Sequence, residues 1–217
     1  MSEAGPDYAE RAEAGVLEAA LALAPAQGWT WPMTYAAGRV AGLSRGEVEL
    51  LLPEGPRDLA ALFSRRHDRA ALLALADLDP AAMKVRERIR RAVRTRLEAA
   101  LADAEAVRRW TGFLALPANL ALAARLVWES ADGLWRWAGD VSTDANHYSK
   151  RAILAEILAS SLAIWLVSGE AEALAHLDRR IEAVMTFERL KAKVTRGGLG
   201  EGVANALGRV RYGLLRG

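Results

Sequence analysis

Residues 30–53, TWPMTYAAGRVAGLSRGEVELLLP, decide the fold that we expect for the amino-terminal part of this chain. Thr30 is placed to cap a short helix that has a proline in its first turn. Gly42 then allows a tight turn, and Ser44 with Glu47 forms a capping box that opens a second short helix. Two helices joined by a three-residue glycine turn are typical of a helix-turn-helix unit.

The charge of the second short helix argues against DNA binding. Residues 44–52 take the position of a recognition helix, but Arg45 is their one base against Glu47 and Glu49. Such a surface would repel phosphate. We therefore interpret the unit as structural and do not expect DNA binding. A helix expected over residues 8–24 precedes this unit, and together they resemble the start of TetR-type regulators. One possible function is therefore a transcriptional regulator that responds to a hydrophobic ligand, which we keep as the alternative to the function predicted below.

The rest of the chain repeats its apolar residues with a helical period, and no window shows the alternation of a strand. The fold class is therefore predicted to be all-α. His67 and the arginines of residues 81–102 are interpreted as solvated. Further helices are expected over residues 58–77, 81–102, 103–114, 118–137, 146–167 and 170–187.

The amino-acid composition and the absence of known catalytic motifs argue against several classes of enzyme and metal site. The chain has 217 residues, of which 52% are hydrophobic, and its net charge is +2, which suits one packed domain. It has no cysteine, and its three histidines lack the spacing of a metal site. No phosphate-binding loop or nucleophile elbow is present. The sequence therefore predicts neither an enzyme nor a cofactor.

The middle of the chain is more apolar than one helix face requires. Residues 110–137 hold many tryptophans and leucines, which must contact the core, a partner or an apolar ligand. Residues 146–167 are apolar on nearly all sides and include small residues that allow close helix approach. This pattern favours a dimer formed through residues 146–167 and 170–187.

The positive charge lies at the carboxy-terminal end. From Arg189 onward there are seven basic residues against Glu201. A glycine hinge at residues 197–200 precedes a stripe at helical spacing, and basic residues flank it, which is typical of an interfacial membrane helix. The alternative is that the stripe packs on its own domain or on a neighbouring subunit. The predicted membrane-binding residues are Val203, Leu207, Arg209, Val210, Arg211 and Leu214.

Acidic residues near the start of the chain oppose a secretory or transit peptide, so we expect the protein to stay where it is made. The bias toward arginine and alanine indicates a bacterial source. We therefore expect a location in the bacterial cytoplasm, peripheral on the inner membrane. Both of the most apolar stretches fall short of a bilayer span, so no transmembrane helix is expected.

Residues 132–154, DGLWRWAGDVSTDANHYSKRAIL, carry a long and specific pattern. They resemble the signature of the ubiquinone (coenzyme Q) biosynthesis accessory family, whose members have a TetR-like fold. A weaker resemblance extends from about Glu13 to Glu188. The implied division is a degenerate helix-turn-helix unit at 1–53, a lipid-binding and dimerisation domain at 54–188, and the basic hinge with its membrane helix at 189–217.

The resemblance implies a non-enzymatic, lipid-binding homodimer at a membrane surface. Such a protein would hold an isoprenoid lipid and present a ubiquinone precursor to the di-iron hydroxylase that acts on demethoxyubiquinone. A helical scaffold without a ligand is the remaining alternative. The residues that we expect to border the lipid are Phe113, Leu116, Leu120, Val127, Trp128, Ile157 and Trp165.

The same resemblance implies a partner-binding patch around the signature. The sequence departs from relatives at His147, where they carry Trp, and at Leu134, where they carry Met. Tyr148 and Arg151 have the chemistry of interface anchors. Alternatively, Tyr148 packs in the core and Arg151 pairs with Asp140 or Asp144. The predicted patch consists of Asp132, Leu134, Asn146, His147, Tyr148 and Arg151.

Overall fold

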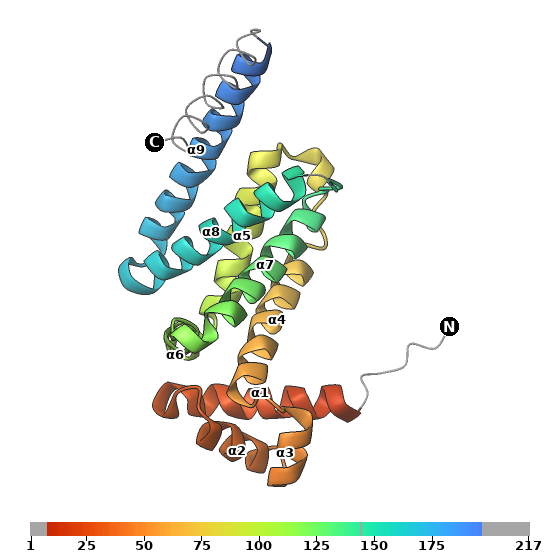
Figure 1. Ribbon diagram of the computed structural model, residues 1–217, viewed down its shortest axis with the longest axis vertical. Coiled ribbons are helices and arrows are strands. Elements are labelled where there is room, and N and C mark those ends of the chain that lie inside the picture. The colour runs from red at the N-terminus through yellow and green to blue at the C-terminus, as the bar shows by residue number, and fades with distance from the viewer. Residues whose placement is uncertain (1–7, 144, 197–217) are drawn as a thin grey trace, which may run out of the picture.

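The computed structural model describes residues 8–143 and 145–196, with side chains described as far as residue 186. These residues form α-helices and two short 3-10 turns with no strand, which confirms the all-α fold (Figure 1). The helices are α1 Tyr8–Gln27, α2 Trp31–Val40, α3 Arg45–Leu51, α4 Pro56–Ala74, α5 Val85–Leu101, α6 Ala104–Leu114, α7 Leu120–Trp137, α8 Ala145–Ser168 and α9 Glu170–Arg196. The 3-10 turns are η1 Pro80–Ala82 and η2 Pro117–Asn119.

The helix-turn-helix unit has the predicted caps. The Thr30 hydroxyl accepts a hydrogen bond from the Met33 amide at 3.3 Å. Ser44 and Glu47 form both bonds of the capping box, and Gly42 joins α2 to α3 with a φ of +80°. The helices α1, α2 and α3 lie together at one end of the molecule (Figure 1).

The larger helical part extends from this unit along α4. Helices α4, α5 and α7 run side by side, and α8 packs against α7 and α9 (Figure 1). A cluster of buried aromatic rings joins the two parts, because Phe63 on α4 contacts Trp29 and Trp110 with ring centroids 5.2 and 5.9 Å apart. The Trp110 indole donates to the Ala60 carbonyl at 3.0 Å, so its one polar atom is satisfied inside the core.

Several predicted boundaries differ from the structure. Helix α1 continues through Pro25 to Gln27, and α5 begins at Val85 because η1 and a short link precede it. Helix α9 continues to Arg196, past the predicted end near residue 187. The hinge and the predicted membrane-binding residues between 203 and 214 lie outside the described residues.

Two residues that we interpreted as solvated are buried. His67 is 1% exposed and Arg96 is 6% exposed. His67 follows Ala60, Phe63 and Ser64 on the inner face of α4 at helical spacing, so it enters the core with them. Burial, together with the nearby positive charge of Arg96 and Arg66, lowers the pKa of His67 to about 3.

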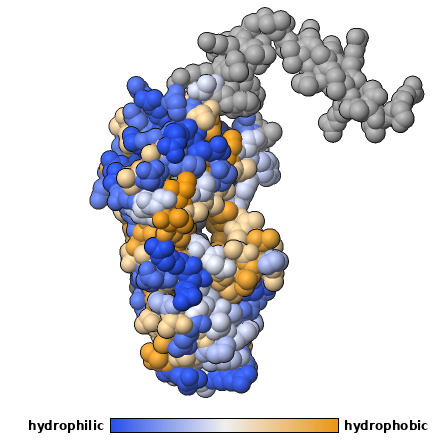
Figure 2. All heavy atoms as spheres, turned by 90° about the vertical axis from the view of Figure 1, so that its left-hand side faces the viewer, coloured by the Kyte–Doolittle hydropathy of each residue, from blue (hydrophilic) through white to orange (hydrophobic). Residues whose placement is uncertain are grey.

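Helix α8 extends one residue beyond the predicted range of 146–167 at each end. Residues Asn146–Ser168 meet the length and composition of a membrane span, which corrects the expectation that no segment does. Buried core helices can satisfy the same criterion, and α8 packs against α7 and α9 here. Only 28% of its most apolar window is buried. Figure 2 shows apolar residues gathered around the middle of the side of the molecule where α8 and α9 lie.

Candidate functional site

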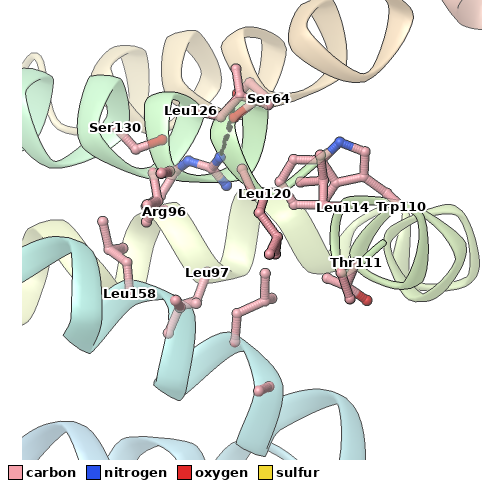
Figure 3. A pocket seen from close by; sticks show the side chains of 17 residues that line it. Ser64, Arg96, Leu97, Trp110, Thr111, Leu114, Leu120, Leu126, Ser130 and Leu158 are labelled. Atoms are coloured by element: carbon pink, nitrogen blue, oxygen red, sulfur yellow. Dashed lines mark hydrogen bonds between the residues drawn. The ribbon is translucent and has the colours of Figure 1, made fainter. Parts of the chain in front are cut away.

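A cavity of about 440 Å³ lies between α4, α5, α6, α7 and α8 (Figure 3). Its volume falls in the range of small-molecule sites. Most of its lining is apolar, and several alanines leave the space that larger side chains would fill. The lining residues are Ser64, Arg96, Leu97, Trp110, Thr111, Leu114, Ala115, Leu120, Ala123, Ala124, Leu126, Val127, Ser130, Leu158, Ala159, Leu162 and Ala163.

One part of the lining is polar, and we call Ser64, Arg96 and Ser130 of that lining, together with Asp68 that binds two of them, the pocket cluster. Asp68 Oδ1 accepts from Arg96 Nε at 2.5 Å and from Ser130 Oγ at 2.7 Å. Arg96 Nη2 reaches the carbonyl and hydroxyl oxygens of Ser64 at 3.4 and 3.5 Å. Figure 3 shows the Arg96 side chain extending from α5 toward Ser64 on α4. A buried arginine, paired with a half-buried aspartate, therefore lies at the wall of a mostly apolar cavity.

Two of the seven predicted lipid contacts, Leu120 and Val127, line this cavity. The other five do not. Phe113 packs on the amino-terminal core, Leu116 is 52% exposed between α6 and η2, and Trp128 lies beside Tyr148 with ring centroids 6.2 Å apart. Ile157 and Trp165 belong to the core that α8 shares with α5, α7 and α9.

Ile157 instead lines a second cavity of about 250 Å³ between α5, α7, α8 and α9. Its walls include Ile89, Trp135 and Ile181, with Lys150 among the polar residues at its edge. This cavity is smaller than the first one and has no buried ion pair among its lining residues that the structure describes. We therefore take the larger cavity as the candidate site.

The polar residues of the cavity and its alanines were not predicted from the sequence. Large apolar side chains marked the predicted lipid contacts, whereas a cavity forms where such side chains are absent. One signal was available: Ser64 and Asp68 are four residues apart on α4, on the face that also carries Phe63 and His67. A serine and an aspartate on a core-facing stripe require buried partners, and Arg96 supplies one.

The signature residues form a second polar group, the motif cluster: Asp132, Asp140, Ser142, Lys150 and Arg151. Arg151 donates to Asp132 at 2.5 Å and to Asp140 at 2.9 Å. Asp140 also accepts from Lys150 at 2.6 Å and from Ser142 at 2.7 Å. Burial alone would raise the pKa of Asp140, but these hydrogen bonds hold it below its usual range. The cluster ties the loop after α7 to the start of α8.

Only part of the predicted partner patch reaches the surface. Leu134 is 1% exposed and Arg151 is 2% exposed, so both act inside the protein. Arg151 pairs with Asp140, which was the alternative considered for it. Tyr148 is 65% exposed, which excludes the alternative that it packs in the core. Asn146 is also exposed, and His147 and Asp132 are half-buried.

The part of the chain that forms most of the cavity wall and the motif cluster is similar to known proteins. Residues 120–188 match the sequence profile of the COQ9 family. The family resemblance is confirmed. The human mitochondrial ubiquinone biosynthesis protein COQ9 is 30% identical over 154 residues, which cover 68% of this chain and 48% of that protein. The mitochondrial COQ9-B of Xenopus laevis is 28% identical over 203 residues, 85% of this chain and 67% of that protein.

The chain thus spans about half the length of the human COQ9 protein and of the rat protein, which it matches with 30% identity over 156 residues. These COQ9 relatives are mitochondrial proteins of animals. The expected location in a bacterial cytoplasm was therefore wrong. That expectation rested on amino-acid bias and on acidic residues near the start of the chain, and neither property is specific to a compartment.

Proposed function

We propose that the protein is a non-enzymatic, lipid-binding accessory protein of ubiquinone biosynthesis. It holds the chain of a polyprenylated quinone precursor in the cavity between α4 and α8 and presents this lipid to the di-iron hydroxylase that acts on demethoxyubiquinone. The observation that carries the proposal is the mostly apolar cavity of about 440 Å³ in a chain that matches the COQ9 family over residues 120–188. Ten of its seventeen lining residues lie in the segment that matches the family.

The surface around the signature supports a partner site. Tyr148 stacks beside Trp128 and contacts His147, with ring centroids 6.2 and 5.2 Å apart. His147 is attached to the motif cluster, because its carbonyl accepts from Arg151 at 3.2 Å and its Nδ1 lies 2.9 Å from the Ser142 carbonyl oxygen. Tyr148 is the exposed ring of this group, and a tyrosine on the surface is typical of an interface anchor. The hydroxylase is the partner that we assign to this surface.

The apolar surface of α8 and α9 supports homodimer formation. Val167 is 86% exposed, and little of the most apolar part of α8 is buried within one chain. A second copy of the same helices would cover this surface. Sedimentation equilibrium of the full chain at micromolar concentration should give a dimer, and a monomer would overturn this part of the proposal.

Membrane association is assigned to the segment after α9. Truncation after Arg196 should abolish sedimentation with anionic liposomes and leave the thermal unfolding of the helical part unchanged. Undiminished liposome binding by the truncated protein would exclude this segment as the anchor.

The alternative function, a lipid-responsive transcriptional regulator, is disfavoured by the surface of α3. Arg45 is bound to Glu49 at 2.9 Å and lies 4.6 Å from the centre of the Tyr35 ring. Its charge is therefore compensated by a carboxylate at the place where phosphate would bind. Sequence-specific DNA binding in a low-salt mobility-shift assay would reverse this conclusion.

Two measurements test the central proposal. The full chain is purified from cells that make ubiquinone, and an organic extract of the protein is analysed by mass spectrometry. The extract should contain an isoprenoid quinone or its precursor, and an extract without either would contradict lipid carriage. Expression in cells that lack their own COQ9 protein should restore ubiquinone. Failure to restore it by a stably expressed protein would contradict the biosynthetic role.

A further inference from the structure

We propose that Arg96 is the residue that recognises the head of the bound lipid, and that it selects a head carrying a neutral hydrogen-bond acceptor over an acidic head. This inference rests on the proposed lipid-binding function and adds the chemistry of the site's polar part. The inference is based on a charged side chain, 6% exposed, in the wall of a cavity whose other lining residues are uncharged and mostly apolar.

The hydrogen bonds of Arg96 leave part of its guanidinium unused. Nε donates to Asp68, and Nη2 makes only long contacts to Ser64, at 3.4 and 3.5 Å. Within the described part of the chain, Nη1 has no hydrogen bond to protein. A guanidinium carries five N–H donors, and Nη1 is not among the buried atoms without a partner, so it stays accessible to a ligand in the cavity. An acceptor atom of a ligand would therefore be stabilised here.

The local charge favours a neutral acceptor. Asp68 accepts from Arg96 at 2.5 Å, so the pair has no net charge. The other polar residues of the pocket cluster, Ser64 and Ser130, are also uncharged, and Arg96 is the one ionisable residue in the described lining of the cavity. A carboxylate or phosphate would bring a negative charge close to Asp68 without a second cation in the wall, and desolvation of that charge would remain uncompensated.

A carbonyl oxygen avoids this penalty. It can accept from Nη1 while Asp68 keeps its bonds to Arg96 and Ser130, and the hydrocarbon chain can occupy the alanine-rich part between α7 and α8. The polar group thus sets the orientation of the ligand, with its head at Arg96 and its chain along the apolar walls. Quinones, ketones and esters share this chemistry.

The test measures how three probes bind to the delipidated full-length protein. The probes share a chain of thirteen carbons and differ in their head: tridecane, 2-tridecanone and tridecanoate. Competition against a fluorescent apolar probe reports their relative affinities. The wild-type protein should bind 2-tridecanone about tenfold more tightly than tridecane, because a hydrogen bond to a charged donor contributes roughly that factor. Tridecanoate should bind less tightly than the ketone.

The decisive variant is Arg96→Lys, which keeps a positive charge for Asp68 but removes the guanidinium N–H groups that face the cavity. The preference for the ketone should disappear, while tridecane binding and thermal unfolding stay close to wild type. Arg94→Lys is the matched control, since Arg94 lies on the same helix and pairs with Glu98 at the surface. It should keep the full preference.

The outcomes separate this inference from the function on which it rests. Suppose that tridecane binds. If the wild-type protein shows no preference for the ketone, or if Arg96→Lys keeps that preference, recognition by Arg96 is overturned while the lipid site stands. Tighter binding of tridecanoate than of the ketone likewise overturns the selection of a neutral head. If none of the probes binds, the proposed lipid-binding function fails, and the inference fails with it. Should Arg96→Lys not fold, Ser64→Ala gives the second test, because freeing Nη2 should strengthen the ketone preference.

Discussion

The pocket cluster and the motif cluster contain the same kinds of groups but differ in what remains unpaired. In the motif cluster Arg151 binds Asp132 and Asp140, and Asp140 also accepts hydrogen bonds from Lys150 and Ser142. In the pocket cluster Arg96 meets one carboxylate and has donors left toward a cavity. The closed network acts as a structural support, whereas the open one has the capacity to bind a ligand.

The largest effect is expected from breaking the motif cluster. Arg151→Met removes the buried residue that bridges Asp132 and Asp140 and leaves these carboxylates with only the more exposed Arg136 and Lys150, which should lower the free energy of unfolding by about 3 kcal/mol. Urea denaturation at pH 7 measures this loss. Arg136→Met is the control, because Arg136 binds Asp132 from the surface and is 73% exposed. A loss of less than about 1 kcal/mol for Arg151→Met would show that the network is not structural.

The two clusters should also respond to pH in different ranges. His67, next to the pocket cluster, has its pKa lowered to about 3 in the folded protein, so between pH 6.5 and 3 the unfolded chain binds a proton that the folded chain does not. Stability should therefore fall as the pH drops, by about 2 kcal/mol between pH 7 and pH 5. Asp140, whose pKa is also lowered, loses its contribution only at more acidic pH, as the pH falls through its folded-state pKa.

The His67→Leu variant isolates this effect. It should flatten the decrease in stability between pH 7 and pH 5, as measured by urea denaturation at both values. An equally steep decrease in the variant would assign the pH dependence to other groups.

The smallest effect on stability is expected at the surface outside the motif cluster. Tyr148→Ala should change the free energy of unfolding by no more than about 0.5 kcal/mol, because the ring is 65% exposed, yet it should weaken binding of the hydroxylase at least tenfold. Tyr8→Ala is the matched control, since Tyr8 is 66% exposed far from this surface. Unchanged hydroxylase affinity in a folded Tyr148→Ala protein would exclude the proposed docking site.

Local signals predicted the helices but not the cavity. Caps such as Thr30 and the box of Ser44 with Glu47 act within four residues, so the sequence was sufficient to place α2 and α3. The pair of Arg96 with Asp68 joins residues 28 positions apart on different helices, and an exposed arginine stripe explained α5 equally well before the packing was known. The pairing of Arg151 with Asp140 was foreseen as an alternative because both residues belong to one short motif.

The lipid contacts were harder to predict for a related reason. Helical spacing identifies which residues are apolar but not which neighbour each face meets, so Trp165 and Ile157 entered the core shared with α9. The cavity depends on small side chains such as Ala123 and Ala159, whose importance appears only when five helices are assembled. The end of α9 was missed because its apolar pattern weakens before the helix itself ends.

The most direct test of the account compares the lipid content of two alanine variants on α7. Ala123 lines the cavity, whereas Ala121 lies on the exposed side of the same helix. The moles of lipid extracted per mole of protein, quantified by mass spectrometry, should fall several-fold in Ala123→Phe, because the ring occupies part of the space that the lipid chain needs. Ala121→Phe should keep the wild-type value. Wild-type lipid content in a folded Ala123→Phe protein would contradict the claim that this cavity holds the ligand.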